Sequence, residues 1–156
     1  MNSNVKNKLK LIAIKKSEEG RFLPNGVDEV ELSVFLSSCK AELGGEPPQD
    51  YLEFLKLHNG LTVEGVFVYS TKRLPIVGST AKTLAFVEMN VISRDVEELK
   101  GFLVFGDSDQ DEYVLDLSTG MYQVRDKQAF DNVYEEFECF DDLLLFMLDL
   151  ALRRIG

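Results

Sequence analysis

The middle of the sequence holds a short helical pattern with a marked start and a marked end, Pro47-Pro48-Gln49-Asp50-Tyr51-Leu52-Glu53-Phe54-Leu55-Lys56-Leu57-His58-Asn59-Gly60. Pro48 suits the first turn of a helix, where its missing N–H leaves no hydrogen bond unmade. Asn59 and Gly60 suit the end, because both residues tolerate the left-handed conformation. A helix this short needs a larger body to dock against. The pattern therefore predicts a helix that joins an N-terminal helical part to a β part.

Two helical patterns precede this central helix. Residues 3–16 carry an apolar stripe among lysines and favour an amphipathic helix, although part of this run could also pass for a strand. Asp28 can cap a second helix, with Glu31 completing a capping-box pair, and this helix would run to about Leu43. The stripe of the first helix consists of Val5, Leu9 and Ile12. The second helix is expected to place in the core Val30, Val34, Phe35, Leu36 and Cys39.

The second half of the chain has the alternation and the turns of a β-sheet. Residues 63–69 are β-branched or aromatic at most positions and predict a strand, and residues 80–100 look helical. Three strands joined by short turns follow, and then an edge strand. These strands are expected at residues 101–106, 112–117, 121–125 and 133–137. We therefore expect an α+β fold with a central, mainly antiparallel sheet, a meander, flanked by N-terminal and C-terminal helices.

The chain closes with a helical pattern over residues 140–155 that is apolar nearly all round. Its apolar run is about half of the ~20 residues that span a bilayer, so we expect no membrane segment. A helix of this kind is buried on both sides or contacts another copy, which leaves a homodimer through this helix open. The sequence shows no linker, repeat or low-complexity tract, so we expect residues 1–156 to form a single domain.

Charge is concentrated in one segment of the chain. The formal net charge is −10, and residues 107–149 hold thirteen Asp or Glu against Arg125 and Lys127, so this segment alone carries −11. Such a surface either keeps the protein soluble or attracts a basic partner. It disfavours nucleic acid as a direct ligand, because binding there depends on neutralising phosphates. Cys39 and Cys139 form no zinc or disulfide pattern, and without a signal-peptide pattern we expect a cytoplasmic protein.

No motif for catalysis, a metal or a cofactor stands out. Asp107, Asp109 and Asp111 match the first three ligand positions of a calcium loop, but the later glycine and glutamate that such a loop requires are missing. These residues predict an acidic hairpin turn instead, a charged patch at a loop tip. His58, the only histidine, has no nucleophile pattern to serve. We therefore expect no enzymatic activity, no metal and no cofactor.

Four features, taken in order along the chain, carry a resemblance to a known superfamily. They are Glu42-Leu43-Gly44 before Pro48, Tyr51, Phe54-Leu55 and His58-Asn59-Gly60; the strand Val66 to Tyr69; Val104-Phe105-Gly106-Asp107 leading into Tyr113-Val114-Leu115-Asp116 and Gly120-x-Tyr122; and Phe137-Glu138-Cys139-Phe140-Asp141-Asp142. On these motifs residues 28–156 resemble the SUKH superfamily, which includes yeast cell-wall-regulator-like proteins and many bacterial immunity proteins. The family usually opens the central helix with Leu-Pro, where this chain has Pro47-Pro48.

The resemblance implies a SUKH-like α+β domain without enzymatic activity. In bacteria it implies an immunity protein that binds and neutralises a toxin, often a nuclease, and such partners are frequently basic, which fits the acidic segment. The alternative that the resemblance offers is a regulatory scaffold of the yeast type. The binding surface of the family does not carry over residue by residue, so candidate partner-binding residues are chosen from charge and predicted exposure. They are Asp107, Asp109, Asp111, Glu112 and Tyr69.

Overall fold

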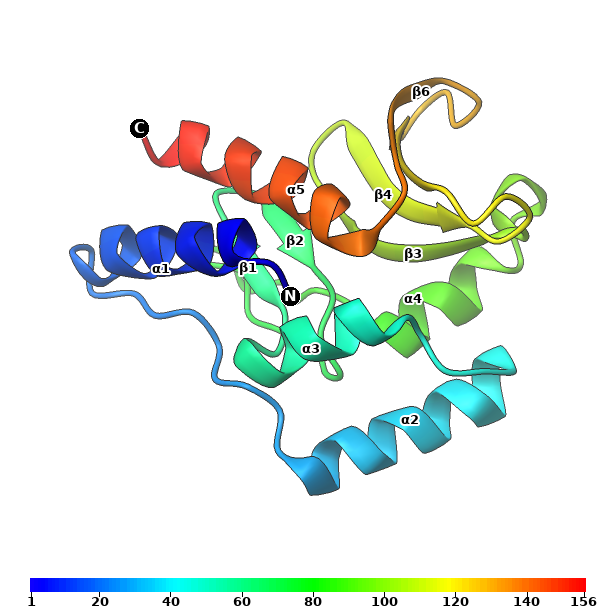
Figure 1. Cartoon of the computed structure of the whole chain (residues 1–156), viewed down its shortest axis with the longest axis horizontal. Coiled ribbons are helices and arrows are strands. Elements are labelled where there is room, and N and C mark those ends of the chain that lie inside the picture. The colour runs from blue at the N-terminus through cyan, green and yellow to red at the C-terminus, as the bar shows by residue number, and fades with distance from the viewer.

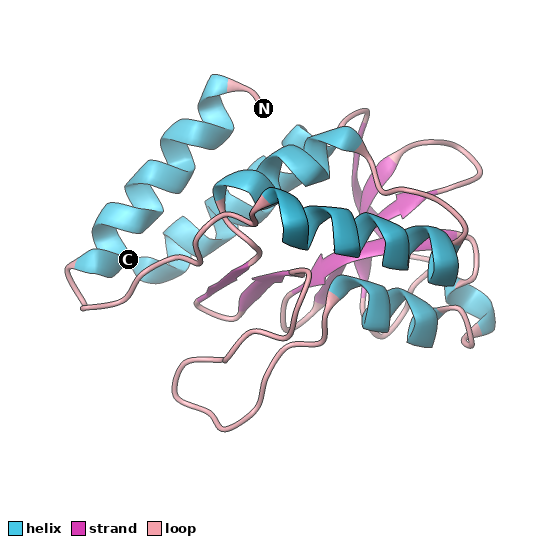
Figure 2. Cartoon of the chain, turned by 90° about the horizontal axis from the view of Figure 1, so that it is seen from below, coloured by secondary structure: helices cyan, strands magenta, loops and turns pink.

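A computed structural model describes all residues from 1 to 156 and shows a six-stranded antiparallel sheet with helices around it (Figures 1 and 2). The helices are α1 (Ser3–Ser17), α2 (Glu29–Leu43), α3 (Gln49–Leu57), α4 (Phe86–Ser93), the 3-10 turn η1 (Glu97–Leu99) and α5 (Phe140–Ile155). The strands are β1 (Leu61–Val63), β2 (Val66–Val68), β3 (Phe102–Asp107), β4 (Asp111–Asp116), β5 (Tyr122–Asp126) and β6 (Val133–Phe137). They lie in the sheet in chain order, each antiparallel to the next. The predicted α+β meander between terminal helices is confirmed.

Helix α3 lies at the centre of this arrangement, as its pattern predicts. Tyr51 is fully buried, and its hydroxyl donates a 2.6 Å hydrogen bond to the backbone carbonyl of Tyr69. Aromatic rings from α4, β3 and α5 surround the Tyr51 ring, with centroids 4.8 to 5.6 Å away: Phe86, Phe105 and Phe140. Rings packed edge-to-face or tilted at this spacing add to the stabilisation from burial. One side chain of α3 therefore connects two helices with the middle of the sheet.

Helix α5 is covered on two sides by its own chain. Helix α1 runs beside it (Figure 1), and an ion pair between Lys8 and Asp149 joins the two helices. On its other side α5 packs on the sheet through Phe140 and Met147, both fully buried. Packing within one chain thus explains why α5 is apolar nearly all round, and a homodimer through α5 stays a prediction. None of the helices combines the length and the apolar character that crossing a membrane requires.

The strand predicted over residues 63–69 is a hairpin instead of one strand. Strands β1 and β2 pair antiparallel around the two-residue turn Glu64-Gly65. Both turn residues have positive φ, 50° for Glu64 and 76° for Gly65. A two-residue hairpin turn requires this conformation, which Asn-Gly usually supplies. The turn was missed because a glutamate occupies its first position, where non-glycine residues rarely adopt positive φ.

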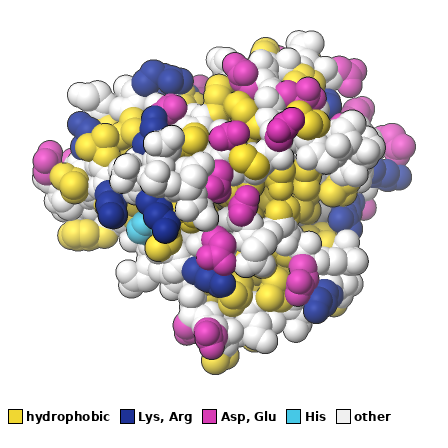
Figure 3. Space-filling model, viewed as in Figure 1, with side chains coloured by type: hydrophobic (Ala, Val, Ile, Leu, Met, Phe, Trp, Pro, Cys, Tyr) yellow, Lys and Arg dark blue, Asp and Glu magenta, His cyan; other side chains and the backbone are white.

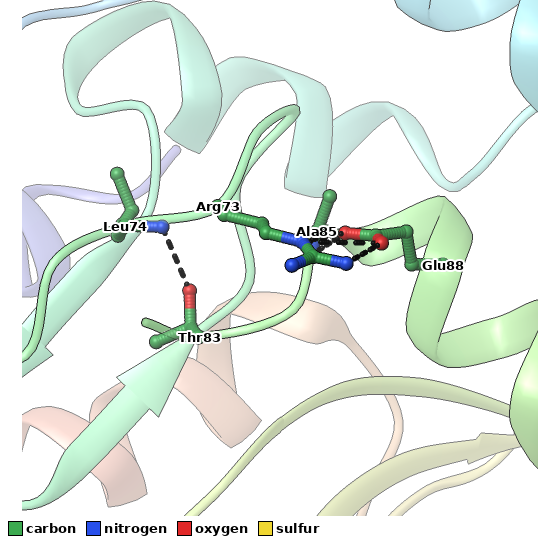
Figure 4. A network of polar contacts seen from close by, with 5 residues as sticks. All are labelled: Arg73, Leu74, Thr83, Ala85 and Glu88. Atoms are coloured by element: carbon green, nitrogen blue, oxygen red, sulfur yellow. Dashed lines mark hydrogen bonds and ion pairs between the residues drawn. The ribbon is translucent and has the colours of Figure 1, made fainter. Parts of the chain in front are cut away.

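The helix predicted over residues 80–100 is confirmed only in its middle. Two hydrogen bonds between Thr83 and Leu74 hold the loop before α4 in a non-helical conformation. The Thr83 hydroxyl accepts from the Leu74 N–H at 3.0 Å (Figure 4), and the Thr83 N–H donates to the Leu74 carbonyl at 2.8 Å. Glu88 then marks the helix start by accepting from the Ala85 N–H at 3.0 Å. Arg73 holds the same carboxylate at 2.6 Å. Helix α4 therefore begins only at Phe86.

Helix α2 packs on the body along one narrow side. Asp28 caps it by accepting from the N–H of Glu31 at 2.7 Å, as predicted. The expected capping-box pair is not completed, because the Glu31 carboxylate accepts from Asn59 and Thr71 instead. The expectation that Val30 and Val34 lie in the core is wrong, because these side chains are 76% and 65% exposed. The buried residues of the helix are Phe35 and Cys39, and Leu36 is half-buried. Helix α2 lies at the periphery of the molecule in Figure 1, where the side chains of Val30 and Val34 are exposed.

Candidate protein-binding site

The four acidic residues predicted to bind a partner lie together at one end of the sheet. Asp107 ends β3, Asp111 and Glu112 begin β4, and Asp109 lies in the turn between these strands. Asp126, the last residue of β5, joins them because it is paired with Asp111 across the sheet. We call these five residues the acidic sheet end.

Two pairs of carboxylates face each other across neighbouring strands here. Asp107 is paired with Glu112 between β3 and β4, and Asp111 is paired with Asp126 between β4 and β5. Paired residues project from the same face of a sheet, and like charges directly opposite each other destabilise it. The fold therefore holds negative charge at this end of the sheet at an electrostatic cost.

Asp111 and Glu112 have no partner within the chain. Neither carboxylate accepts a hydrogen bond, and the Oε2 atom of Glu112 is buried and unpaired. Burial, reinforced by the charge of Asp107, raises the pKa of Glu112 to about 7. Burial also raises the pKa of Asp111, and the charges of Asp109 and Asp126 act in the same direction. Lys127 acts against the rise in both pKa values, and Arg154 does so at Asp111, but neither cation forms an ion pair with these carboxylates, so both would gain from a closer cation.

Two cations border the acidic sheet end and pair with Asp107 and Asp109, whereas Asp126 accepts a hydrogen bond from the hydroxyl of Tyr134. The Nζ atom of Lys127 lies 3.4 Å from the carboxylate of Asp107. Arg154, near the end of α5, lies 2.5 Å from the carboxylate of Asp109 and lowers its pKa. Cations of the chain therefore neutralise only Asp107 and Asp109 among the five carboxylates.

Tyr69, the fifth predicted residue, is not on the surface. Its side chain is only 2% exposed, so the expectation of exposure is wrong for Tyr69. Asp107, Asp111 and Glu112 are only partly exposed, and Asp109 alone is fully exposed as expected. The Tyr69 hydroxyl donates to the carboxylate of Asp107 at 2.5 Å. Burial, together with the charge of Asp107, raises the pKa of this phenol well above its usual value. Tyr69 therefore orients Asp107 from below instead of contacting a partner.

A second group of acids, on β6 and its flanks, extends the negative surface beyond the predicted residues. It consists of Asp131, Glu135, Glu136, Glu138 and Asp142, all exposed. Acidic side chains gather at the upper right of Figure 3, over the part of the molecule where β6 lies in Figure 1. Of the thirteen carboxylates between residues 107 and 149, three form ion pairs: Asp107, Asp109 and Asp149. The acidic composition of the edge strand was visible in the sequence, but its place beside the acidic sheet end depends on strand order.

The single histidine and the two cysteines lie in settings that indicate structural roles. The Nδ1 atom of His58 lies 2.8 Å from the carbonyl oxygen of Pro24 and joins the end of α3 to the segment before α2. Cys39 is buried, which raises its pKa to about 11, and neither Cys39 nor Cys139 is in a disulfide. No group of three or more His, Cys, Asp or Glu side chains is arranged to hold a metal ion.

Two clefts lie on the helical side of the molecule. A groove of about 700 Å³ runs between α2 and α4 and is lined by the exposed side chains of Val34 and Ile92. A cleft of about 560 Å³ lies between the segment 21–26 and the loop 72–77. Charges of both signs line each of them, so neither shares the single sign of the acidic sheet end.

A comparison with models of known protein families gave no match, and a search of curated proteins found no similar sequence. The class of the molecule is therefore defined by its own fold and site. It is an α+β protein with an antiparallel meander whose acidic residues gather at one end and one edge of the sheet.

Proposed function

We propose that this chain is a non-enzymatic binding protein that holds a basic protein partner at the acidic sheet end. The observation that carries the proposal is the state of Asp111 and Glu112, two carboxylates without any partner in the chain, each opposite another carboxylate. Asp111 and Glu112 are adjacent in β4 and project to opposite faces of the sheet, so a lysine or arginine from a partner on either face would relieve the repulsion of one pair. In keeping with the resemblance to the SUKH superfamily, the partner is a bacterial toxin, possibly a basic nuclease, and the protein is its immunity protein.

Charge complementarity between two proteins mainly raises their rate of association. A surface of one sign raises the rate of association with a partner of the opposite sign, and salt weakens this attraction. The acidic sheet end and the acids of β6 supply such a surface. Lys127 and Arg154 border it, and Arg125, which lies between Glu112 and β6, has its guanidinium stacked on the rings of Phe102 and Phe130. Binding would therefore be tight at low ionic strength and weaker at high ionic strength.

A regulatory scaffold is the second candidate, and one observation favours it. The groove between α2 and α4 exposes Val34 and Ile92 on a side of the molecule where no acidic strand lies. A scaffold binds several partners and would use this apolar surface in addition to the charged one. Capture that does not change with salt and that is lost when Val34 is replaced by Asp would support this alternative.

The decisive experiment is capture of the toxin domains encoded beside this chain, at low and at high salt. Stoichiometric capture of a basic domain that weakens at high salt is the expected result. Asp111→Asn with Glu112→Gln removes the two unpaired charges without breaking a hydrogen bond, and should lower the affinity about tenfold or more. Failure to capture any neighbouring domain would contradict the immunity role.

The matched control is Glu18→Gln with Glu42→Gln, which changes the net charge by the same amount. Both residues are exposed, lie at the C-terminal ends of α1 and α2, and form no ion pair. Equal losses of affinity in the two double variants would mean that overall charge, and not the acidic sheet end, attracts the partner. Growth rescue in cells that produce the toxin, measured with both variants, separates binding from neutralisation.

A further inference from the structure

Strand β6 is a free edge of the sheet. It is the last strand in the sheet order and pairs with β5 on one side only. Residues 133–136 are all exposed, and no backbone group of β6 forms a hydrogen bond with any segment outside the sheet. A row of unpaired N–H and C=O groups is a template for a further strand from another chain.

The side chains of this edge are acidic and uncompensated. Glu135 and Glu136 are adjacent, so they project to opposite faces of the strand and place a carboxylate on each. Glu136 accepts a 2.6 Å hydrogen bond from Gln123, and no side chain bonds to Glu135. The cation of the neighbouring strand is engaged elsewhere, because the guanidinium of Arg125 stacks on the rings of Phe102 and Phe130. Acids also flank the strand: Asp131 and Glu138.

A second copy of this chain fits the edge poorly. Two β6 strands side by side would bring four glutamates together, and like charges across a strand pair are destabilising. The pairing of β5 with β6 also skips Tyr134, so β6 contains a bulge that shortens and twists the edge. A short segment of opposite charge avoids the repulsion and needs only a short edge.

We propose that β6 accepts an extended, basic segment of the partner protein as a seventh strand of the sheet. Backbone hydrogen bonds along residues 133–137 would supply affinity, and Lys or Arg side chains on alternate faces would meet Glu135 and Glu136. The edge is continuous with the acidic sheet end, because Val133 is paired with Arg125, which in turn is paired with Glu112. The inference specifies how the partner docks, and for the identity of that partner it rests on the proposed function.

The first test uses a peptide, Val-Lys-Val-Lys-Val-Lys-Val, with the intact chain and amide-resolved NMR. Addition of this peptide is expected to shift the resonances of residues 133–137 and to slow hydrogen exchange of the β6 amides that face outward. The same peptide with every backbone amide N-methylated keeps its charges but cannot form a strand. Equal binding of both peptides would overturn the proposal, because attraction of charge alone would then explain it.

Charge variants locate the binding. Glu135→Lys with Glu136→Lys should lower the affinity for the lysine peptide at least tenfold, a difference of about 1.4 kcal/mol in binding free energy. Glu18→Lys with Glu42→Lys changes the net charge equally, places each lysine at a helix C-terminal end where it is tolerated, and should change the affinity less than twofold. Equal losses in the two double variants would also overturn the edge site.

The peptide and the toxin domains give separable outcomes. In one outcome, a toxin domain is captured while neither that domain nor the lysine peptide slows hydrogen exchange of the β6 amides. That result would refute strand addition and leave the immunity role standing. Slower β6 exchange with the lysine peptide but no captured toxin domain would support the edge site and refute the immunity role.

Discussion

Two charged side chains in this molecule, one buried and one partly buried, differ in whether the chain provides them with ion-pair and hydrogen-bond partners. Lys16 on α1 is only 5% exposed, and its ammonium group lies 2.7 Å from the carboxylates of both Glu19 and Glu64. Glu112 on β4 has a buried oxygen with no hydrogen bond, and it lies opposite Asp107. A charge that leaves water is costly unless partners replace its hydration. The chain supplies those partners at Lys16 and withholds them at Glu112.

The contrast distinguishes a structural charge from a charge available to a partner. Lys16 holds the β1–β2 turn, where Glu64 adopts a positive φ that costs on the order of 1 kcal/mol or more. Its two ion pairs offset that strain and anchor α1 to the edge of the sheet. Glu112 anchors nothing in its own chain, which is the condition expected at a site where a second protein completes the interactions.

The largest effect is expected for Lys16→Met. Loss of the ammonium group removes both ion pairs and leaves only Arg154, which donates to the Glu64 carbonyl at 3.0 Å, to hold the strained turn, so the free energy of unfolding should fall by about 2–3 kcal/mol. Urea denaturation at neutral pH measures this change. Lys10→Met, on the exposed side of the same helix and without an ion pair, should stay within about 0.5 kcal/mol of the parent. Similar losses in both variants would mean that Lys16 is not a structural charge.

Glu112→Gln should change stability in the opposite direction. Because the folded-state pKa of Glu112 is about 7 and the usual value is 4.5, the folded state binds more protons between these pH values. Stability of the parent protein therefore decreases as the pH rises from about 4.5 to 7, and the penalty is complete above that range. The glutamine side chain escapes it, so at pH 8 we expect Glu112→Gln to be more stable by about 2 kcal/mol.

The pH dependence of that gain separates ionisation from packing. Chemical denaturation of both proteins at pH 5 and pH 8 should show the advantage of Glu112→Gln shrinking toward zero at the lower pH. Glu98→Gln, a substitution at an exposed residue without an ion pair, serves as the control and should show no such trend. An advantage of equal size at both pH values would show that the carboxylate of Glu112 is not held in a raised-pKa environment.

Much of the fold could be predicted from periodicity and turn signals, since helix and strand patterns were long and bounded. Helices α1, α2, α3 and α5 and the strands of the meander lie where their patterns place them, within a few residues. The errors fall where tertiary contacts override local pattern. The loop before α4 is held by Thr83 and Leu74, and the turn at Glu64 depends on Lys16, which is 48 residues away in the sequence.

The candidate site could be predicted in part for the same reason. A short turn between two strands necessarily brings Asp107 and Asp111 together, so the acidic hairpin followed from local sequence alone. Burial of Tyr69 did not, because the residues that cover and bond it, among them Tyr51, come from elsewhere in the chain. The edge position of β6 depends on strand order, which no local pattern specifies.

Asp111→Asn should change stability least, and it tests most directly whether a charge without a partner is kept for binding and not for the fold. Removal of one charge from the pair with Asp126 should stabilise the fold by about 0.5 kcal/mol at low ionic strength, and by less at 1 M salt, where screening acts over about 3 Å. Asp95→Asn, exposed and unpaired, should leave stability unchanged at both salt concentrations. If Asp111→Asn lowers stability, the carboxylate has a structural role as Lys16 does. If the substitution raises stability and weakens capture of a basic partner, the negative charge of Asp111 is kept for binding at the expense of the fold.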